Sequence, residues 1–172
     1  SGMGTYIQER TDKNSKQETC GQTQIFQEKE NGQQAENWMQ ISFSAKSENE
    51  GFARTAVAAF VSYLNPTIEE LADIKTAVSE AVTNCSIHGY NLKGGIVWLE
   101  AGVLDRTLHV AITDEGRGIA DIQKALEPLF TTRPDLERSG MGFSFMEAFM
   151  DTVEVASAPG KGTRVLMTRE IR

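Results

Sequence analysis

The sequence predicts an α+β fold, a two-layer sandwich in which helices cover one face of a mixed β-sheet. Two observations carry this expectation. Segments in the middle and at the end of the chain alternate apolar and polar residues, as half-buried strands do, and segments between them place apolar residues at helical spacing. Glycine and proline mark several of the junctions. A chain of 172 residues holds one such domain.

Residues 1–38 differ in composition from the rest of the chain. They are rich in Gln, Glu, Lys, Asn, Thr and Gly, and their few apolar residues follow no period. Such a segment buries too little apolar surface to offset its ordering entropy. We therefore expect a polar, flexible N-terminal extension, with Ser1-Gly2 an added sequence, and a folded domain over residues 39–172. The alternative is a short helix or strand of the extension that docks on the domain.

The first elements of the domain are a strand and a helix. Apolar and polar residues alternate over 39–44, which predicts a half-buried strand. Ser47 and Glu50 have the spacing of a capping box, and an apolar stripe over 52–64 predicts the helix that follows it. Asn65-Pro66 ends this helix.

A second capping box, Thr67 with Glu70, opens a helix that runs to residue 87 or 88, with Gly89 as its stop. The remaining elements alternate strands with a loop and a helix. In chain order they are strands at 97–103 and 107–113 with a turn at Asp105-Arg106, a loop at 115–142, a helix at 143–150, and strands at 153–157 and 163–168.

Composition and charge exclude several classes of function. The formal net charge is −7 and no run of Lys or Arg occurs, so direct binding to nucleic acid is not expected. An acidic surface suits a basic protein partner. No apolar run approaches the length of a membrane span and no secretory signal opens the chain, so we expect a cytoplasmic protein. Cys20 and Cys85 lie in different contexts and are expected to be free thiols.

Three polar residues form a stripe on the second predicted helix. Glu80, Asn84 and His88 are four residues apart, beside an apolar face. The stripe is either an ordinary solvated face or one side of a cleft. Asn is a poor residue for a helix interior, which favours the cleft. There, Asn84 offers an oxygen ligand to Mg²⁺, and Glu80 could polarise an attacking hydroxyl or water. For His88, a hydrogen bond near phosphates and a helix-capping role are both open.

Asp114 continues the core-facing row of a predicted strand. A carboxylate there is costly unless it meets a donor, so it either turns to solvent or accepts the exocyclic amine of adenine in a pocket. Gly116 and Gly118 follow at once and let the backbone pass close to a flat ring, while Ile119 could line the pocket.

Two further glycine-rich segments complete the candidate site. Ser139-Gly140-Met141-Gly142-Phe143 precedes a helix, where backbone amides can bind an anion. Hydroxyl and guanidinium groups suited to phosphate lie in the same predicted loop: Thr131, Thr132 and Arg138. Gly160 is expected to serve mainly a hairpin turn, whereas Gly162 and Thr163 could approach the adenine end.

These pieces, in this order, resemble the Bergerat-fold (GHKL) ATPases, which include gyrase-type ATPases and histidine kinases. The matching motifs are Glu80-Ala-Val-Thr-Asn84, Asp114-Glu-Gly-Arg-Gly118, Gly140-Met-Gly142 and Gly160-Lys-Gly162-Thr163. Within that superfamily, residues 39–172 look most like anti-sigma factor serine kinases of the sporulation anti-sigma F type. One departure is Cys85, where a small residue such as alanine is commoner; it falls on the apolar side and should be tolerated.

The resemblance implies the Bergerat ATP-binding fold and a homodimeric protein serine kinase that uses ATP and Mg²⁺. Its partners would be a sigma factor, which it sequesters, and an anti-anti-sigma protein of the STAS fold, on which it phosphorylates a serine. Glu80 would be the catalytic base, Asn84 the magnesium ligand and Asp114 the adenine contact. Thr132, Arg138, Gly140 and Gly142 would contact phosphates. Arg54 would contact both partners, although a solvated helix arginine fits the sequence as well.

Two other functional hypotheses are consistent with these motifs. One is the catalytic domain of a histidine kinase, but residues 1–38 are too short and too polar for the dimerising helices that precede such domains, and that family usually has a lysine at the position of His88. The other is a nucleotide-dependent module that only binds a sigma factor, against which the retained Glu80 argues.

Overall fold

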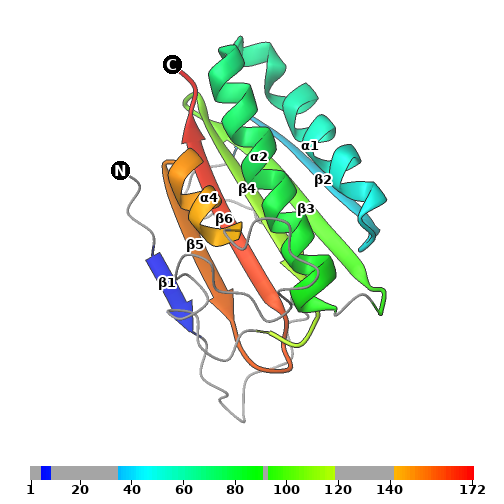
Figure 1. The fold of residues 1–172 in the computed structure, drawn as a ribbon. Helices are drawn as coiled ribbons and strands as arrows, with labels where there is room; N and C mark the ends of the chain where they lie inside the picture. The colour runs from blue at the N-terminus through cyan, green and yellow to red at the C-terminus, as the bar shows by residue number, and fades with distance from the viewer. Residues whose placement is uncertain (1–4, 9–34, 91–92, 119–141) are drawn as a thin grey trace.

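The computed structural model describes residues 5–8, 35–90, 93–118 and 142–172, which form a six-stranded sheet with helices on one face (Figure 1). The strands are β1 (Thr5–Gln8), β2 (Asn37–Ser44), β3 (Ile96–Leu104), β4 (Thr107–Asp114), β5 (Thr152–Ser157) and β6 (Thr163–Glu170). Their order across the sheet is β1-β5-β6-β4-β3-β2. All neighbours are antiparallel except β1 and β5, so the sheet is mixed, as predicted.

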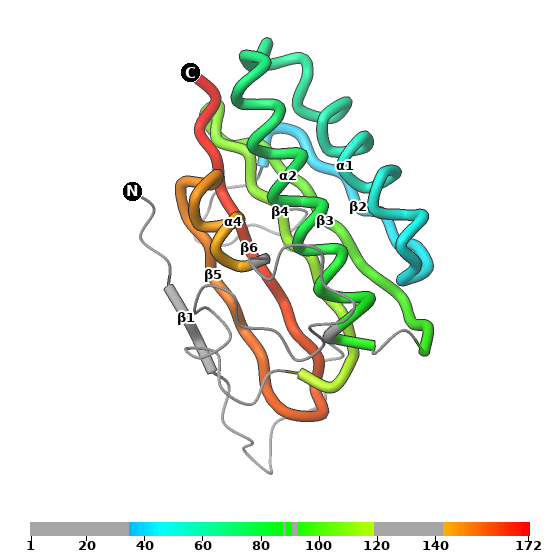
Figure 2. Tube along the Cα trace, viewed as in Figure 1, coloured from blue at the N-terminus to red at the C-terminus, as the bar shows by residue number. Residues whose placement is uncertain are grey.

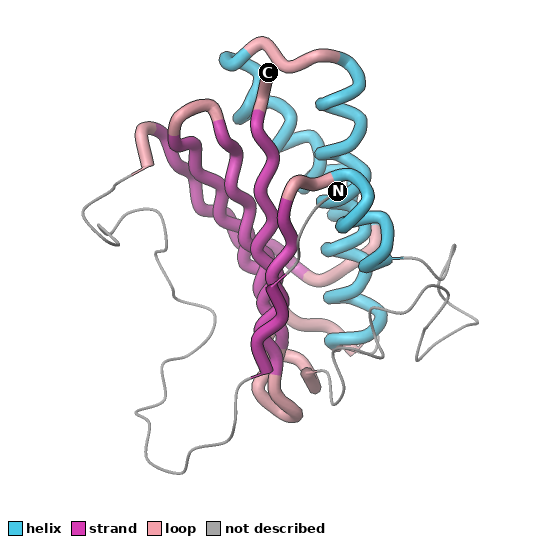
Figure 3. Tube along the Cα trace, turned by 90° about the vertical axis from the view of Figure 1, so that its left-hand side faces the viewer, coloured by secondary structure: helices cyan, strands magenta, loops and turns pink. Residues whose placement is uncertain are grey.

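The helices form the second layer. They are α1 (Glu48–Val61), α2 (Ile68–Asn84) and α4 (Gly142–Phe149), with the short turns η2 (Ser62–Leu64) and η3 (Cys85–Gly89). Figure 3 shows these helices together on one side of the sheet. The core lies between the layers, where one face of α2, including Ile74, Val78 and Val82, meets Leu99 and Ile112 of the strands. No helix in the described ranges is long and apolar enough to cross a membrane.

The two predicted capping boxes have different outcomes. At α1 the prediction is wrong, because Ser47 makes no side-chain cap bond and has helical backbone angles. The Glu50 carboxylate instead accepts a hydrogen bond from Thr83 Oγ1 of α2 at 2.9 Å and pairs with Arg54 at 3.6 Å. The Glu50 carboxylate therefore makes a tertiary contact with α2 in place of the local cap.

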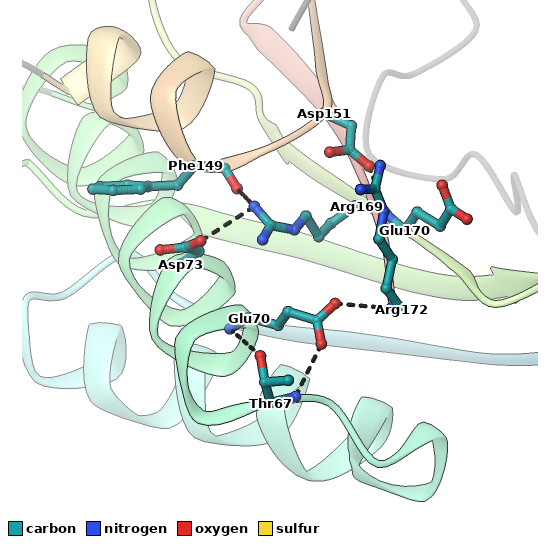
Figure 4. Close-up of polar contacts among 8 residues, drawn as sticks. All are labelled: Thr67, Glu70, Asp73, Phe149, Asp151, Arg169, Glu170 and Arg172. Atoms are coloured by element: carbon teal, nitrogen blue, oxygen red, sulfur yellow. Dashed lines mark hydrogen bonds and ion pairs between the residues drawn. The ribbon is translucent and has the colours of Figure 1, made fainter. Parts of the chain in front are cut away.

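At α2 the capping box is confirmed. Thr67 Oγ1 accepts a hydrogen bond from the Glu70 backbone N at 3.0 Å, and Glu70 Oε1 accepts one from the Thr67 backbone N at 2.9 Å (Figure 4). Glu70 Oε2 also accepts from the Arg172 backbone N at 2.9 Å. These N–H groups, that of Thr67 first, hold the pKa of the buried Glu70 carboxyl below its ordinary value.

The end of β6 is fixed to two helices beside this cap. Arg169 Nη1 forms an ion pair with Asp73 Oδ2 of α2 at 3.2 Å and donates a hydrogen bond to the Phe149 carbonyl of α4 (Figure 4). Figure 2 shows the C-terminus next to the start of α2. The last strand therefore anchors the N-terminal end of α2.

The turn between β3 and β4 is tied to the rest of the fold by a side chain. Asp105 and Arg106 both have positive φ, at 48° and 62°, as a tight hairpin requires. The Arg106 guanidinium donates to the Leu64 carbonyl at 2.7 Å and to the Ile171 carbonyl at 3.1 Å. The turn predicted at these two residues is confirmed.

Part of the predicted extension is ordered in a strand. Residues 5–8 form β1, which pairs in parallel with β5, from Thr5 opposite Glu154 to Gln8 opposite Ser157. This is the docked alternative for those four residues. The next strand begins at Asn37, two residues before Met39. Residues 1–4 and 9–34, including Cys20, lie outside the described ranges, whereas Cys85 is a free thiol, as expected.

Candidate functional site

The predicted polar stripe lies at the C-terminal end of α2. Glu80 and Asn84 are one turn apart and both are half-buried, beside the buried residues Ala81 and Val82. The helix stops at Gly89, as predicted, but its last turn is the π-helical η3, closed by a bond from the Tyr90 backbone N to the Cys85 carbonyl at 2.9 Å. His88 lies within η3, and its side chain is outside the described part of the structure.

The side-chain amide of Asn84 lacks a hydrogen-bond partner at its nitrogen within the described structure. Its Nδ2 atom is buried and has no hydrogen-bond partner among the described residues. A buried polar group in this state costs about 1–3 kcal/mol. The oxygen and nitrogen of a side-chain amide exchange places by a flip, so this position can meet a ligand oxygen through Nδ2 or a cation through Oδ1. The chemistry of the donor therefore fits a metal–phosphate ligand.

Asp114, the last residue of β4, is buried and not turned to solvent, with 3% of its surface exposed. Its Oδ1 accepts a hydrogen bond from the Gly116 backbone N at 2.9 Å. Burial raises the pKa of this carboxyl to about 6, against the lowering effect of hydrogen bonds from Gly116, Cys85 and Thr163. The carboxylate is thus held in place but poorly solvated, and a further donor would stabilise its charged form.

Cys85 links the end of α2 to this carboxylate. The thiol is buried and lies within hydrogen-bond reach of Asp114, and burial first, then the negative charge of Asp114, raise the pKa of the thiol well above its ordinary value. The expected position on the apolar side is correct, since Cys85 belongs to the core. Its contact with Asp114 was not predicted, because helical spacing does not reveal contacts with a strand.

Glycines allow three backbone segments to meet around Asp114. A Cβ at Gly116 would overlap the Gly89 carbonyl, and one at Gly118, where φ is +73°, would overlap the Ala158 carbonyl. The Arg117 backbone N donates to the Gly89 carbonyl at 2.9 Å, and the Gly160 backbone N donates to the Arg117 carbonyl at 2.6 Å. The segment after β4 is therefore packed between η3 and the β5–β6 turn, at a distance that side chains would prevent.

The β5–β6 turn reaches the same place. Thr163 lies opposite Asp114 in the β4–β6 pairing, and a Cβ at Gly162 would overlap the Asp114 carbonyl. Ser157 Oγ donates to the Gly162 carbonyl at 2.9 Å and lies 2.8 Å from Thr163 Oγ1. By contrast, a Cβ at Gly160 would meet nothing within 4 Å, so its φ of +76° and not close packing accounts for glycine in this turn.

The structure thus groups Asp114, Gly116, Gly118, Gly162 and Thr163, next to the turn that follows Asn84. Phe143 packs partly buried against the core, one residue after Gly142 begins α4. The other predicted site residues lie outside the described ranges: Ile119, Thr131, Thr132, Arg138, Ser139, Gly140 and Met141.

The predicted partner contact, Arg54, lies on α1. Its side chain is 41% exposed and pairs with Glu50, whose side chain is 16% exposed. Phe52, two residues earlier in the sequence, is 52% exposed and packs edge-on against Phe43 with ring centroids 5.9 Å apart. Arginine and aromatic residues are enriched at protein interfaces, and α1 exposes one of each, although residues two apart lie on different sides of a helix.

Comparisons with known proteins identify the family of the domain. A family model described as the histidine kinase-like ATPase domain matches residues 43–169. The anti-sigma F factor of Caldanaerobacter subterraneus subsp. tengcongensis is 59% identical over 135 residues, which cover 78% of this chain and 94% of that protein. The anti-sigma F factor of Clostridium acetobutylicum is 58% identical over 135 residues, with the same coverage of 78% and 94%.

A solved structure shares the fold. The crystal structure of the RsbU and RsbW domains of Rv1364c from Mycobacterium tuberculosis matches with a TM-score of 0.57 at 19% sequence identity. The match covers 78% of this chain and 32% of that one.

Proposed function

The chain belongs to the family of histidine kinase-like ATPase domains, in the group of the anti-sigma F factors, and on this premise we propose that it is an ATP-dependent protein serine kinase. It binds and inhibits a sigma factor, and it phosphorylates a serine of an anti-anti-sigma partner of the STAS fold. The observation that carries the proposal is the buried Nδ2 atom of Asn84, which has no partner among the described residues. Asn84 lies one turn after Glu80 and one residue before the thiol that reaches Asp114.

The residues of the site divide the work of binding. Asp114 accepts a hydrogen bond from the 6-amino group of adenine, which supplies the further donor that its buried carboxylate favours. Asn84 coordinates Mg²⁺ through its side-chain oxygen, which is the kind of hard ligand that this ion prefers. Gly116, Gly118, Gly162 and Thr163 form the backbone wall around Asp114, and Thr132, Arg138, Gly140 and Gly142 contact the phosphates.

Glu80 performs the proton transfer. Bound Mg·ATP supplies the phosphoryl group, and the carboxylate of Glu80 accepts the proton of the attacking serine hydroxyl. The half-buried position of Glu80 on a rigid helix, one turn from the metal ligand, suits that role because the carboxylate must be accessible to a second protein. Arg54, on the neighbouring helix α1, contacts both the sigma factor and the STAS protein. The protein is a cytoplasmic homodimer.

A histidine kinase domain and a sigma-binding module without kinase activity are the competing functions. The three are distinguished by incubating the protein with labelled ATP, alone and with a purified STAS partner. We expect label on a serine of the partner. Label on a histidine of the protein itself would support the histidine kinase, and nucleotide-dependent sigma binding without any label would support the module.

A further inference from the structure

The hydroxyl oxygen of Tyr90 lies between two segments of the main chain near the site and bonds to both. Tyr90 follows η3, is partly buried against the core, and its hydroxyl makes two hydrogen bonds. The oxygen accepts from the Glu115 backbone N at 2.7 Å and donates to the Ile96 carbonyl at 2.6 Å. The hydroxyl therefore connects the start of β3 to the residue that follows β4.

The ring that carries this hydroxyl is itself held in position. A Cβ at Gly95 would overlap the Tyr90 ring, so the ring lies directly against the Gly95 backbone. The Tyr90 backbone N donates to the Cys85 carbonyl at 2.9 Å, and the Tyr90 carbonyl accepts from the Lys93 backbone N at 2.9 Å. The hydroxyl is thus fixed from the ring and from the main chain.

Glu115 is the residue through which Tyr90 can act on the site. It is covalently bonded to Asp114 on one side and to Gly116 on the other, and the Gly116 backbone N holds Asp114 Oδ1 at 2.9 Å. One residue further, the Arg117 backbone N is bonded to the Gly89 carbonyl at 2.9 Å. The carboxylate of Asp114 is therefore oriented by a short loop that is tied down at Glu115 and at Arg117.

We propose that Tyr90 is a positioning residue for purine recognition: its hydroxyl fixes the main chain at Glu115 so that Asp114 faces the 6-amino group of adenine. This inference rests on the proposed adenine contact of Asp114 and adds to it a residue that need not touch the nucleotide. A tyrosine that only stabilised the fold would affect all purine nucleotides equally. A positioning tyrosine affects those that carry a 6-amino group.

The test compares two nucleotides and three proteins. Dissociation constants are measured for ATP and for purine riboside triphosphate, which has hydrogen in place of the 6-amino group, with the wild type, Tyr90→Phe and Tyr63→Phe. Tyr63 is the matched control, because it is 51% exposed and precedes α2, whereas Tyr90 follows it. Phenylalanine keeps the ring against Gly95 and removes only the oxygen.

We expect Tyr90→Phe to raise the Kd for ATP about fivefold, equivalent to about 1 kcal/mol, and to change the Kd for purine riboside triphosphate less than about twofold. Tyr63→Phe should change neither. An equal change for both nucleotides, or no change for ATP, would overturn the inference. A wild type that binds ATP no better than purine riboside triphosphate would instead overturn the adenine contact of Asp114, so the two failures are distinguishable.

A second measurement needs no variant. Hydrogen exchange at the Glu115 amide of the nucleotide-free wild type should be slowed by its bond to the Tyr90 oxygen, although Glu115 is exposed. Exchange at the rate of a free amide would overturn the inference, even if Tyr90→Phe folded too poorly to be assayed.

Discussion

The two ends of α2 differ in how completely their polar groups are satisfied. At the N-terminal end, Thr67 and Glu70 bond each other, Glu70 also holds Arg172, and Asp73 pairs with Arg169. At the C-terminal end, the buried Nδ2 atom of Asn84 has no partner in the described structure, and the thiol of Cys85 meets Asp114 of β4, a buried carboxylate with a raised pKa. One end of this helix is therefore held by completed hydrogen bonds, and we propose that the other end completes its bonds with a ligand. Three substitutions and a change of pH test this difference between the two ends.

The largest effect is expected from Glu80→Gln. This change removes the proposed base and little volume, so phosphotransfer to the STAS partner should fall about 100-fold or more. The Kd for ATP should stay within about twofold, because the nucleotide contacts are left intact. Initial rates and equilibrium binding, measured on the same preparation, check both halves. An equal loss of affinity and rate would count against Glu80 as the base.

Next in size is the effect of Glu70→Ala at the other end of the helix. It removes the capping-box acceptor and the bond to Arg172, so the free energy of unfolding should fall by about 3 kcal/mol. Denaturant unfolding measures the loss, and Glu69→Ala, an exposed neighbour, is the control with an expected change below about 0.5 kcal/mol. ATP affinity of the folded variant should be unchanged. A variant as stable as the wild type would show that the satisfied end contributes little.

Asp114→Asn should have the opposite profile. The Kd for ATP should rise about 30-fold, because the charged acceptor for the adenine amine is lost. The amide oxygen can still accept the bond from Gly116, and the loss of a buried charge offsets the loss of an acceptor for Cys85 and Thr163, so the Tm without nucleotide at pH 7.5 should change little. Calorimetric binding and thermal unfolding check the two effects. Unchanged affinity would refute the adenine contact, and a large drop in Tm would make Asp114 a structural residue.

The smallest expected effect is the dependence on pH. Asp114 has a folded pKa of about 6, above its ordinary value of 3.8, so it is protonated more easily in the folded protein. Its contribution to stability therefore falls as pH rises from about 4 to 6, whereas that of Glu70, whose pKa is lowered, is lost as pH falls below its ordinary value of 4.5.

The proposed adenine contact requires the charged carboxylate, so the preference for ATP over purine riboside triphosphate should drop about tenfold between pH 7 and pH 5. The two nucleotides carry the same phosphates, and the ratio of their Kd values thus isolates Asp114. A ratio that does not vary with pH would show that this carboxyl does not titrate in the free protein over that range.

The sequence predicted the layers, the mixed sheet and most elements to within a few residues, because alternation and helical spacing are local patterns. The two capping boxes show where such patterns fail. Ser47 with Glu50 has the same spacing as Thr67 with Glu70. The carboxylate of Glu50, however, accepts a hydrogen bond from Thr83, 33 residues away. The contact of Cys85 with Asp114, the hydroxyl of Tyr90 and the pairing of β1 also join distant segments. No single local motif contains that information.

Residue types and motifs predicted which residues belong to the candidate site, but not which of them contact one another. The alternating row placed Asp114 at the core face but left open a turn to solvent, and the structure decides for burial. The glycines were found from their motifs. What the sequence could not show is that the backbone of Gly89, the predicted helix stop, lies against Gly116, 27 residues later. Close packing of this kind is decided by the approach of three loops in space.

At Arg106 the backbone conformation favours glycine, whereas the side-chain hydrogen bonds require arginine. Its φ of 62° is one that glycine would adopt at lower cost, yet its guanidinium bridges Leu64 and Ile171. An engineer who relaxed the hairpin with glycine would disconnect it from the end of the first helical segment and from the C-terminal residues. Redesign for thermal resistance should leave this position alone and look for gains elsewhere on the surface.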